Sequence, residues 1–280
     1  MIFLEVVVAK TAGFCFGVKR AVDLTEKALE GKSSVYSVGS IVHNKFVNDG
    51  LRKKGLIFVD KVEDVPDNSN VIIRAHGITA KEFEECRKKN LNIVDTTCPN
   101  VKNIHDIVHK YSKDGYYIII IGDEAHPEVI GISGWTDGNF KVINSAMDVE
   151  KCNLENVCVV SQTTMNVELN KTIVDKIRAA AKNCIIFDTI CRATEHRQKE
   201  LKILAADADY VIVIGDKASA NSNRLYDIAK NMCNSKFIEN IDELDLNFLE
   251  QSCKIVVMAG ASTPQCLIDQ VVENLKQKEL

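Results

Sequence analysis

Short apolar runs alternate along the chain with longer segments in which apolar residues recur at helical spacing. The first pattern predicts buried β-strands, and the second predicts helices that bury one face. Some runs, such as Ile118–Ile121, are apolar at every position, which is typical of parallel strands covered by helices on both faces. The alternation therefore predicts an α/β fold with mainly parallel strands.

The predicted strands are Ile2–Val8, Val35–Val38, Leu56–Val59, Val71–Arg74, Asn92–Val94, Tyr116–Ile121, Lys141–Ile143, Val157–Val160, Cys184–Phe187, Tyr210–Ile214, Lys236–Ile238 and Lys254–Met258. The predicted helices are Val18–Glu30, Lys45–Lys54, Val101–Ser112, Val167–Lys182, Ala193–Ala205, Ser222–Met232 and Cys266–Lys276. A further helix, through Lys89, begins at a capping box, because Thr79 and Glu82 can each satisfy a free backbone N–H there.

One spacing occurs three times. In each copy a cysteine lies in a short polar or glycine-containing turn, and a polar residue at a predicted strand end follows 28 residues later. The pairs are Cys15 and His43, Cys98 and His126, and Cys191 and Ser219. Further predicted strands end on polar turns that contain His76, Thr163 and Ser262. Ligands bind at the carboxyl ends of parallel strands, so these turns predict one pocket shared by three repeated units.

The repeat also suggests where the units begin and end. We expect an αβα domain over residues 14–97, a second over 98–190 and a third over 191–280, with a strand from residues 1–13 added to the third. A chain of 280 residues is long enough for two or three such units. No linker rich in Pro, Gly or Ser separates them, so the domains are expected to abut directly.

Composition narrows the function. The chain is 46% hydrophobic and 26% charged, as in soluble globular proteins. Its net charge of −4 argues against a nucleic-acid surface. The apolar run Met1–Ala9 contains Glu5, is too short to cross a membrane and lacks the features of a signal peptide. The sequence thus predicts a cytoplasmic protein with neither a nucleic acid nor a membrane as partner.

Cysteine is the most informative residue type. Of ten cysteines, none forms a Cys-x-x-Cys pair, which gives no support to zinc-ribbon or thioredoxin-like sites. Seven are expected to pack as small hydrophobic residues: Cys86, Cys152, Cys158, Cys184, Cys233, Cys253 and Cys266. The other three, Cys15, Cys98 and Cys191, could hold zinc with a water, but an iron–sulfur cluster fits three thiolates better. A four-iron cluster with three protein ligands leaves one iron open as a Lewis acid.

The remaining polar turns favour an anionic ligand. Hydrogen-bond donors are expected at His43, His76, Ser219, Asn221 and Ser262, and helix N-termini follow several of these turns. No Walker or Gly-x-Gly-x-x-Gly loop is present, so the pattern suggests a diphosphate site of another kind. His105, His109 and His196 lie on predicted helices and are interpreted as structural.

An acid stands beside a histidine at one strand end, in the sequence His126-Pro-Glu128. A carboxyl group near a cluster and a polyanion would have its pKa raised, which suits a general acid. The alternative is that Glu128 simply favours the start of a helix through the helix dipole.

Together these residues make the chain resemble the 4-hydroxy-3-methylbut-2-enyl diphosphate reductase family, which catalyses the last step of the methylerythritol phosphate route to isoprenoids. The resemblance covers essentially the whole chain. It rests on Ala12–Val18, Val42–Asn44, Arg74–Gly77, Asp95–Pro99, Ala125–Glu128, Ser161–Thr164, Cys191–Thr194 with Arg197 and Gln198, Ser222–Arg224 and Ala259–Ser262.

The resemblance implies a trefoil of three αβα domains around one oxygen-sensitive [4Fe-4S] cluster per chain, with Cys15, Cys98 and Cys191 as ligands. The open iron would bind the substrate hydroxyl. The implied diphosphate-binding residues are His43, His76, His126, Ser219, Ala220, Asn221 and Ser262, where Ala220 replaces a serine of many relatives. Glu128 would donate the proton, assisted by His126, and Thr163 would order the hydroxyl and carboxylate network.

The implied reaction is a reductive dehydroxylation to isopentenyl and dimethylallyl diphosphate, with electrons from an external donor such as ferredoxin or flavodoxin. Two other classes of function remain compatible with the residues. A hydro-lyase of the aconitase type also uses three cysteines and an open iron but needs no external electrons. An iron–sulfur electron carrier would usually close its cluster with a fourth cysteine and would not need the His, Ser and Asn turns.

Overall fold

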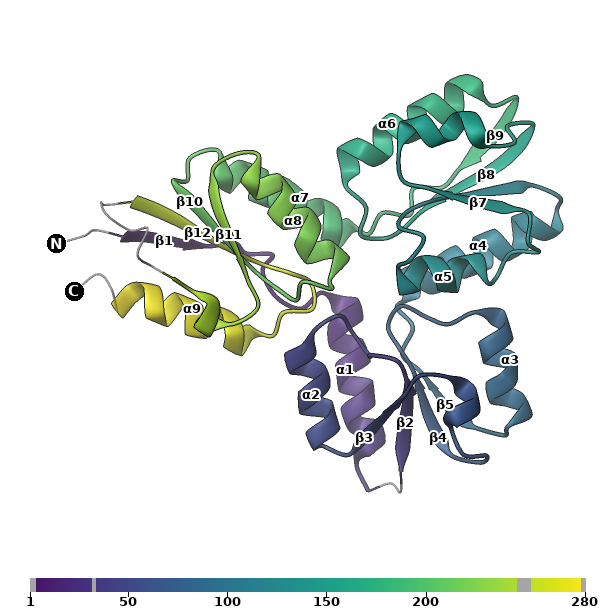
Figure 1. The fold of residues 1–280 in the computed structure, drawn as a ribbon, viewed down its shortest axis with the longest axis horizontal. Helices are drawn as coiled ribbons and strands as arrows, with labels where there is room; N and C mark the ends of the chain where they lie inside the picture. The colour runs from purple at the N-terminus through teal and green to yellow at the C-terminus, as the bar shows by residue number, and fades with distance from the viewer. Residues whose placement is uncertain (1–3, 32–33, 246–252, 278–280) are drawn as a thin grey trace. The chain divides into compact units, whose positions relative to one another are not determined.

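The computed structural model describes residues 4–31, 34–245 and 253–277. Within these ranges the chain forms three parallel four-stranded sheets covered by helices (Figure 1). The α/β fold class expected from the apolar pattern is confirmed. The chain divides into two compact units: unit 1 comprises residues 1–16, 43–47 and 192–280, and unit 2 comprises residues 17–42 and 48–191.

The sheet of unit 1 brings together strands from both ends of the chain. Its order is β1-β12-β10-β11, with every neighbouring pair parallel. The strands are β1 (Leu4–Val8), β10 (Tyr210–Ile214), β11 (Asn234–Ile238) and β12 (Cys253–Ala259). Three helices accompany the sheet: α7 (Arg192–Ala205), α8 (Ala220–Lys230) and α9 (Gln265–Gln277), with a 3₁₀ turn, η3, at Ile241–Glu243. Ile2 and Phe3, predicted as the start of the first strand, lie outside the described residues.

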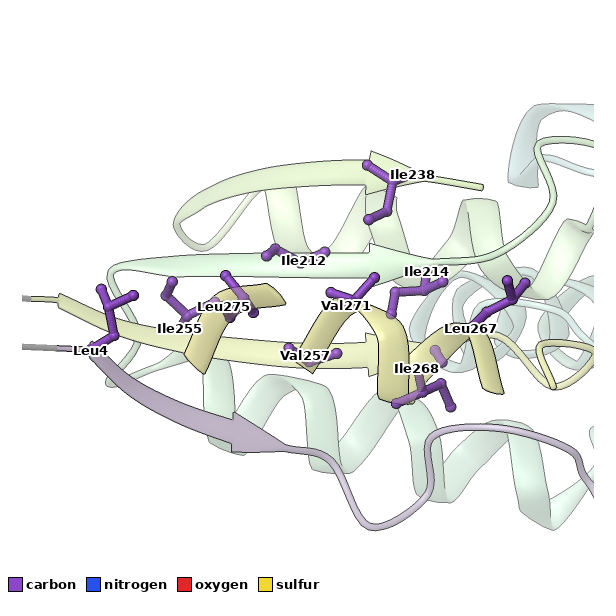
Figure 2. Packing of buried hydrophobic residues seen from close by; sticks show 11 residues of the cluster. Leu4, Ile212, Ile214, Ile238, Ile255, Val257, Leu267, Ile268, Val271 and Leu275 are labelled. Atoms are coloured by element: carbon purple, nitrogen blue, oxygen red, sulfur yellow. The ribbon is translucent and has the colours of Figure 1, made fainter. Parts of the chain in front are cut away.

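Successive side chains of these strands point to opposite faces of the sheet, and because both sets are apolar, helices cover both faces. Ile212, Ile214 and Val257 pack with α9 on one face, while Val211, Val213 and Met258 pack with α7 and α8 on the other. Figure 2 shows Leu267, Ile268, Val271 and Leu275 of α9 lying along the first face. The apolar residues of α9, which recur at helical spacing, thus pack on alternate side chains of the strands, and helices cover both faces of the sheet.

Unit 2 contains the other two sheets. The second sheet has the order β3-β2-β4-β5 and the third has the order β7-β6-β8-β9. The strands are β2 (Val35–Val38), β3 (Leu56–Val59), β4 (Asn70–Ile73), β5 (Asn92–Asp95), β6 (Tyr117–Ile121), β7 (Phe140–Ile143), β8 (Asn156–Ser161) and β9 (Asn183–Ile186). Their helices are α1 (Phe16–Leu29), α2 (Lys45–Lys53), α3 (Ala80–Lys88), α4 (Pro99–Lys113), α5 (Pro127–Ser133) and α6 (Val167–Ala180), with 3₁₀ turns η1 (Val62–Asp64) and η2 (Ala146–Lys151).

The four consecutive isoleucines of strand β6 show why both faces of the third sheet must be covered. Ile118 and Ile120 pack with α4 and α5, and Ile119 and Ile121 pack with α6 on the opposite face. All four side chains have no measurable exposure. Around the second sheet, α1 and α2 lie on one side and α3 on the other (Figure 1). The capping box at Thr79 is present, since its side chain and that of Glu82 exchange hydrogen bonds with backbone N–H groups.

Two expectations need correction. Helix α5, which carries Glu128, was not among the predicted helices. Cys266 was expected to be packed as a small hydrophobic residue, but it is exposed on α9. The domain boundaries after residues 97 and 190 stay predictions. No helix in the described part of the chain is long and apolar enough to cross a membrane.

Candidate active site

Each of the three candidate ligand cysteines directly precedes a helix. Cys15 precedes α1, Cys98 is the N-cap of α4, and Cys191 precedes α7. All three are of intermediate burial, and none forms a disulfide. The N-terminus of a helix carries partial positive charge, which favours thiolates. These positions therefore suit thiolate ligands of an anionic group.

The loop of each cysteine is fixed to the polar turn after the neighbouring strand. In all three cases the cysteine backbone N–H donates to a carbonyl oxygen of that turn: Cys15 to Ala261 at 3.0 Å, Cys98 to Ala75 at 2.9 Å, and Cys191 to Thr163 at 3.0 Å. The acceptors belong to the turns that contain Ser262, His76 and Thr163. Each predicted ligand cysteine thus lies beside one predicted substrate-binding turn of its own sheet.

The three sheets repeat the same order of loops. In each sheet a cysteine follows an outer strand, a polar turn follows the next strand in the sheet, and a second polar residue follows the third strand. The sets are Cys98, His76 and His43 in the second sheet, Cys191, Thr163 and His126 in the third, and Cys15, Ser262 and Ser219 in the sheet of unit 1. The 28-residue step therefore runs from a cysteine of one sheet to a polar residue of the next. The two members of each pair thus belong to different sheets, although each of the expected domains 14–97, 98–190 and 191–280 contains one complete pair.

The carboxyl group of Glu128, in unit 2, is buried. Glu128 is only 2% exposed, and both its carboxylate oxygens accept hydrogen bonds from Thr163. The backbone N–H of Thr163 donates to Oε1 at 2.6 Å, and the threonine hydroxyl donates to Oε2 at 2.7 Å. Burial raises the pKa of Glu128 above its usual value, and the two hydrogen bonds from Thr163 oppose that rise.

His126 is held by the start of α5. It is the N-cap, and its Nδ1 accepts from the backbone N–H of Glu128 at 3.1 Å. A neutral ring with Nδ1 as acceptor carries its proton on Nε2, so His126 offers a donor on that side. The ring of His76 meets it edge-on, with centroids 5.6 Å apart. The two predicted substrate-binding histidines of unit 2 are therefore neighbours.

The turn after His76 requires a glycine. Gly77 has φ of +74°, and a Cβ built on it would lie 2.6 Å from Cε1 of His105. Any other residue would be strained in backbone and would collide with that ring. Gly77 thus allows the backbone beside His76 to pass close over α4.

Unit 1 gathers the other predicted polar residues around the start of α8. Ser219 is the N-cap and its Oγ accepts from the backbone N–H of Ser222 at 3.3 Å. Ala220 and Asn221 form the first turn, and Asn221 is 5% exposed. The Nδ2 atom of Asn221 is buried without a hydrogen-bond partner among the described residues. A buried donor beside a helix N-terminus suits an oxyanion.

The segment around His43 is tied to the same strand ends. Ser262 Oγ donates to the carbonyl oxygen of His43 at 2.8 Å, and the backbone N–H of Lys45 donates to Asp216 Oδ2 at 2.8 Å. Ser262 follows β12 and Asp216 follows β10, which pair in parallel. Unit 1 therefore brings together Cys15, His43, Ser219, Ala220, Asn221 and Ser262, and unit 2 brings together Cys98, Cys191, His76, His126, Glu128 and Thr163.

Three residues near the cysteines were not assigned a role from the sequence. Arg20 Nη1 donates to the carbonyl of Thr97 at 3.2 Å, and Arg197 donates to the carbonyl of Gly13. These arginines hold the loops of Cys98 and Cys15. Asn100 contacts the Cys191 sulfur. Arg197 belongs to a motif of the family resemblance, whereas nothing in the sequence pattern marks Asn100 as part of a site.

A pocket of about 410 Å³ in unit 2 contains none of the predicted site residues. It is lined by residues of α3, α4 and the segment after α5, among them Phe83, His105 and Trp135. His105 stacks on Trp135 with ring centroids 5.4 Å apart, and burial lowers the pKa of His105 to about 4. His105 is therefore a neutral packing residue, in agreement with its structural interpretation.

Comparison with known proteins agrees with the motifs. The LytB protein family matches residues 6–276. The 4-hydroxy-3-methylbut-2-enyl diphosphate reductase of Clostridioides difficile (strain 630) is 41% identical over 98% of this chain and 99% of its own. A solved structure of the E-1-hydroxy-2-methyl-but-2-enyl-4-diphosphate reductase from Plasmodium falciparum superposes with a TM-score of 0.93, at 31% identity over 98% of this chain and 88% of that one.

A second solved structure, of an (E)-4-hydroxy-3-methyl-but-2-enyl diphosphate reductase described as the terminal enzyme of the non-mevalonate pathway, is 38% identical. It covers 99% of this chain and all of its own chain, with a TM-score of 0.71. The resemblance drawn from the motifs is confirmed by these matches.

Proposed function

Because this chain belongs to the LytB protein family of oxidoreductases, we propose that it reduces 4-hydroxy-3-methylbut-2-enyl diphosphate to isopentenyl and dimethylallyl diphosphate. In this reaction the allylic C–O bond breaks, the hydroxyl leaves as water, and two electrons and two protons are taken up. The observation that carries the proposal is the buried Glu128–Thr163 pair, which lies beside the loop of the candidate ligand Cys191.

The donor set supports a [4Fe-4S] cluster on Cys15, Cys98 and Cys191. Three thiols that each directly precede a helix match the soft ligands and the positive surroundings that such an anionic cluster prefers. When bound, the cluster would relay electrons from an external donor, such as a ferredoxin or flavodoxin, and provide an open iron as Lewis acid for the departing oxygen. The protein residues then have to bind the diphosphate, exclude water and deliver a proton.

Glu128 is suited to deliver the proton because burial raises the pKa of its carboxyl group and so favours the protonated form. In that state the 2.7 Å hydrogen bond to Thr163 reverses direction, so that the carboxyl group donates to Oγ1. The threonine hydroxyl then passes its own proton to the leaving hydroxyl group, and water is formed. Thr163 thereby links a fully buried acid to the substrate.

The family resemblance implies the residues that would bind the diphosphate. In unit 1 these are His43, Ser219, Asn221 and Ser262, with backbone N–H groups at Ala220 and the positive end of α8. His76 and His126 supply donors from unit 2. Ala220 lacks a hydroxyl, so its contribution is limited to the backbone.

The proposal is tested by anaerobic purification, iron and sulfide analysis, and a turnover assay with and without a chemical reductant. We expect four irons per chain for a [4Fe-4S] cluster and reductant-dependent formation of both diphosphate products. Turnover without reductant would instead indicate a hydro-lyase. A fully loaded cluster with no turnover of this substrate would refute the proposal.

A further inference from the structure

An amide side chain contacts one of the three candidate ligand sulfurs. Asn100 Nδ2 donates to Cys191 Sγ across 3.1 Å. Both residues belong to unit 2. Asn100 lies in the first turn of α4, the helix that begins at Cys98, and Cys191 directly precedes α7. The contact therefore runs from the helix of one candidate ligand to the sulfur of another.

Folding alone does not explain an asparagine at this position. Asn100 is exposed, so it fills no part of the core. The N-cap of α4 is Cys98, two residues before Asn100, and Pro99 already begins the helix. Asparagine is a weak helix former, and its amide is directed at a sulfur. The side chain is thus better explained by what it contacts.

We infer that Asn100 is a positioning residue that tunes the cluster of the proposed function by hydrogen bonding to the Cys191 sulfur. This inference rests on that proposed function. Reduction adds negative charge that is shared by the ligand sulfurs, and an N–H donor stabilises the reduced state more than the oxidised state. The Asn100 amide therefore makes the cluster easier to reduce, and its loss makes the reduction potential more negative.

The contact differs from those of the two arginines at the other cysteine loops. Arg20 and Arg197 donate to backbone carbonyls of Thr97 and Gly13 and so fix loop conformation. Asn100 donates to the sulfur itself. Replacement of Asn100 is accordingly expected to change the electronic properties of the cluster while leaving the loops in place.

The test compares Asn100→Leu and Asn100→Asp with the wild type. Leucine keeps the approximate size and removes the donor, and aspartate replaces the donor by an anionic acceptor. We expect both variants to retain iron and sulfide and to shift the reduction potential to more negative values, with the larger shift for aspartate. The potential is measured by anaerobic redox titration, and the iron–sulfur stretching bands are followed by resonance Raman spectroscopy. Asn103→Leu, an exposed change on the same helix, is the control and should change neither.

Each outcome is decisive. An unchanged potential in Asn100→Leu, with a full cluster, overturns the role of Asn100 and leaves the proposed function intact. Loss of the cluster from Asn100→Leu, with an unchanged circular dichroism spectrum, also overturns it, because Asn100 would then be needed for cluster retention. A wild-type protein without iron and sulfide overturns the proposed function and this inference together.

Discussion

Thr163 holds both carboxylate oxygens of Glu128, one through its backbone N–H at 2.6 Å and the other through its hydroxyl at 2.7 Å. The two residues come from different strand ends, since Glu128 lies in α5 after β6 and Thr163 follows β8. The carboxyl group therefore has one fixed orientation, and it is buried. Both hydrogen bonds from Thr163 also oppose the rise in the pKa of Glu128 that burial causes.

Glu128→Gln should abolish most turnover, because the amide keeps the size of the carboxyl group but cannot deliver a proton. Loss of a general acid typically costs ~100-fold or more in kcat. Iron and sulfide content should match the wild type. Glu124→Gln, an exposed change in the loop before α5, is the control and should be fully active. Near-normal turnover of Glu128→Gln would remove Glu128 from the acid role.

Thr163→Val should lower kcat and also move the pH profile. The acid works in its protonated form, so activity falls as pH rises through the pKa of Glu128. The threonine hydroxyl lowers that pKa, and its removal should move the alkaline limb to higher pH. We expect a loss of about 10- to 100-fold in kcat and recovery of much of it in Thr163→Ser. A lower kcat with an unmoved alkaline limb would separate the hydroxyl from the titration of Glu128.

Cys98→Ser should lose iron, because serine is a poor ligand for the soft metal centre of an iron–sulfur cluster. The measurement is iron and sulfide per chain after anaerobic purification, with circular dichroism to verify folding. Cys266→Ser changes an exposed cysteine on α9 and should keep the cluster. An intact cluster in Cys98→Ser would contradict the assignment of Cys98 as a ligand.

Asn221→Ala should weaken substrate binding more than it slows the reaction. Its buried Nδ2 has no partner among the described residues and would donate to the diphosphate. A hydrogen bond to a charged group contributes about 1.5–3 kcal/mol, so KM should rise by roughly 10- to 100-fold. Steady-state kinetics separate the two parameters. A fall in kcat at constant KM would place Asn221 nearer the reacting end of the substrate.

His105 should make the fold sensitive to mild acid. Its pKa is about 4 in the folded protein and 6.5 as the reference value, so the unfolded state binds the proton more tightly. Its stabilising contribution is complete above pH 6.5 and is lost as the pH falls toward 4. One pKa unit corresponds to ~1.4 kcal/mol, so the full effect is on the order of 3 kcal/mol.

Urea unfolding at several pH values checks this expectation. His105→Gln should have lower stability at neutral pH but a weaker dependence of stability on pH between 6.5 and 4. His196→Gln, at an exposed position of α7, should behave as the wild type does. An unchanged pH dependence in His105→Gln would assign the acid sensitivity to other groups.

The strands and most helices could be predicted because their apolar periods are strong. β6 is apolar at every position and is buried on both faces, as its sequence predicted. Helix α5 escaped prediction because it has only seven residues and contains Gly131. Such a short segment is too brief for a helical period to stand out.

Some features of the candidate site could likewise be predicted from the sequence, and others could not. Cys98 and His76 could be placed at strand ends from local patterns alone. The hydrogen bond from the backbone N–H of Cys98 to Ala75 depends on which strands are neighbours, and the sequence carries no local sign of that pairing. The pairing of Glu128 with Thr163 likewise depends on β6 and β8 being adjacent. Strand order is a property of the folded sheet, and a spacing along the chain could not reveal it.

The pairing of β1 with β12 has a consequence for biosynthesis. β1 is made before the other strands of the described sheets, while its only paired neighbour in the described sheet, β12, is made after them. The strands of the second and third sheets are complete before α7 is synthesised. Since domains generally fold as they emerge, β1 has to remain unpaired until β12 is made, and β12 then completes the sheet that carries Cys15.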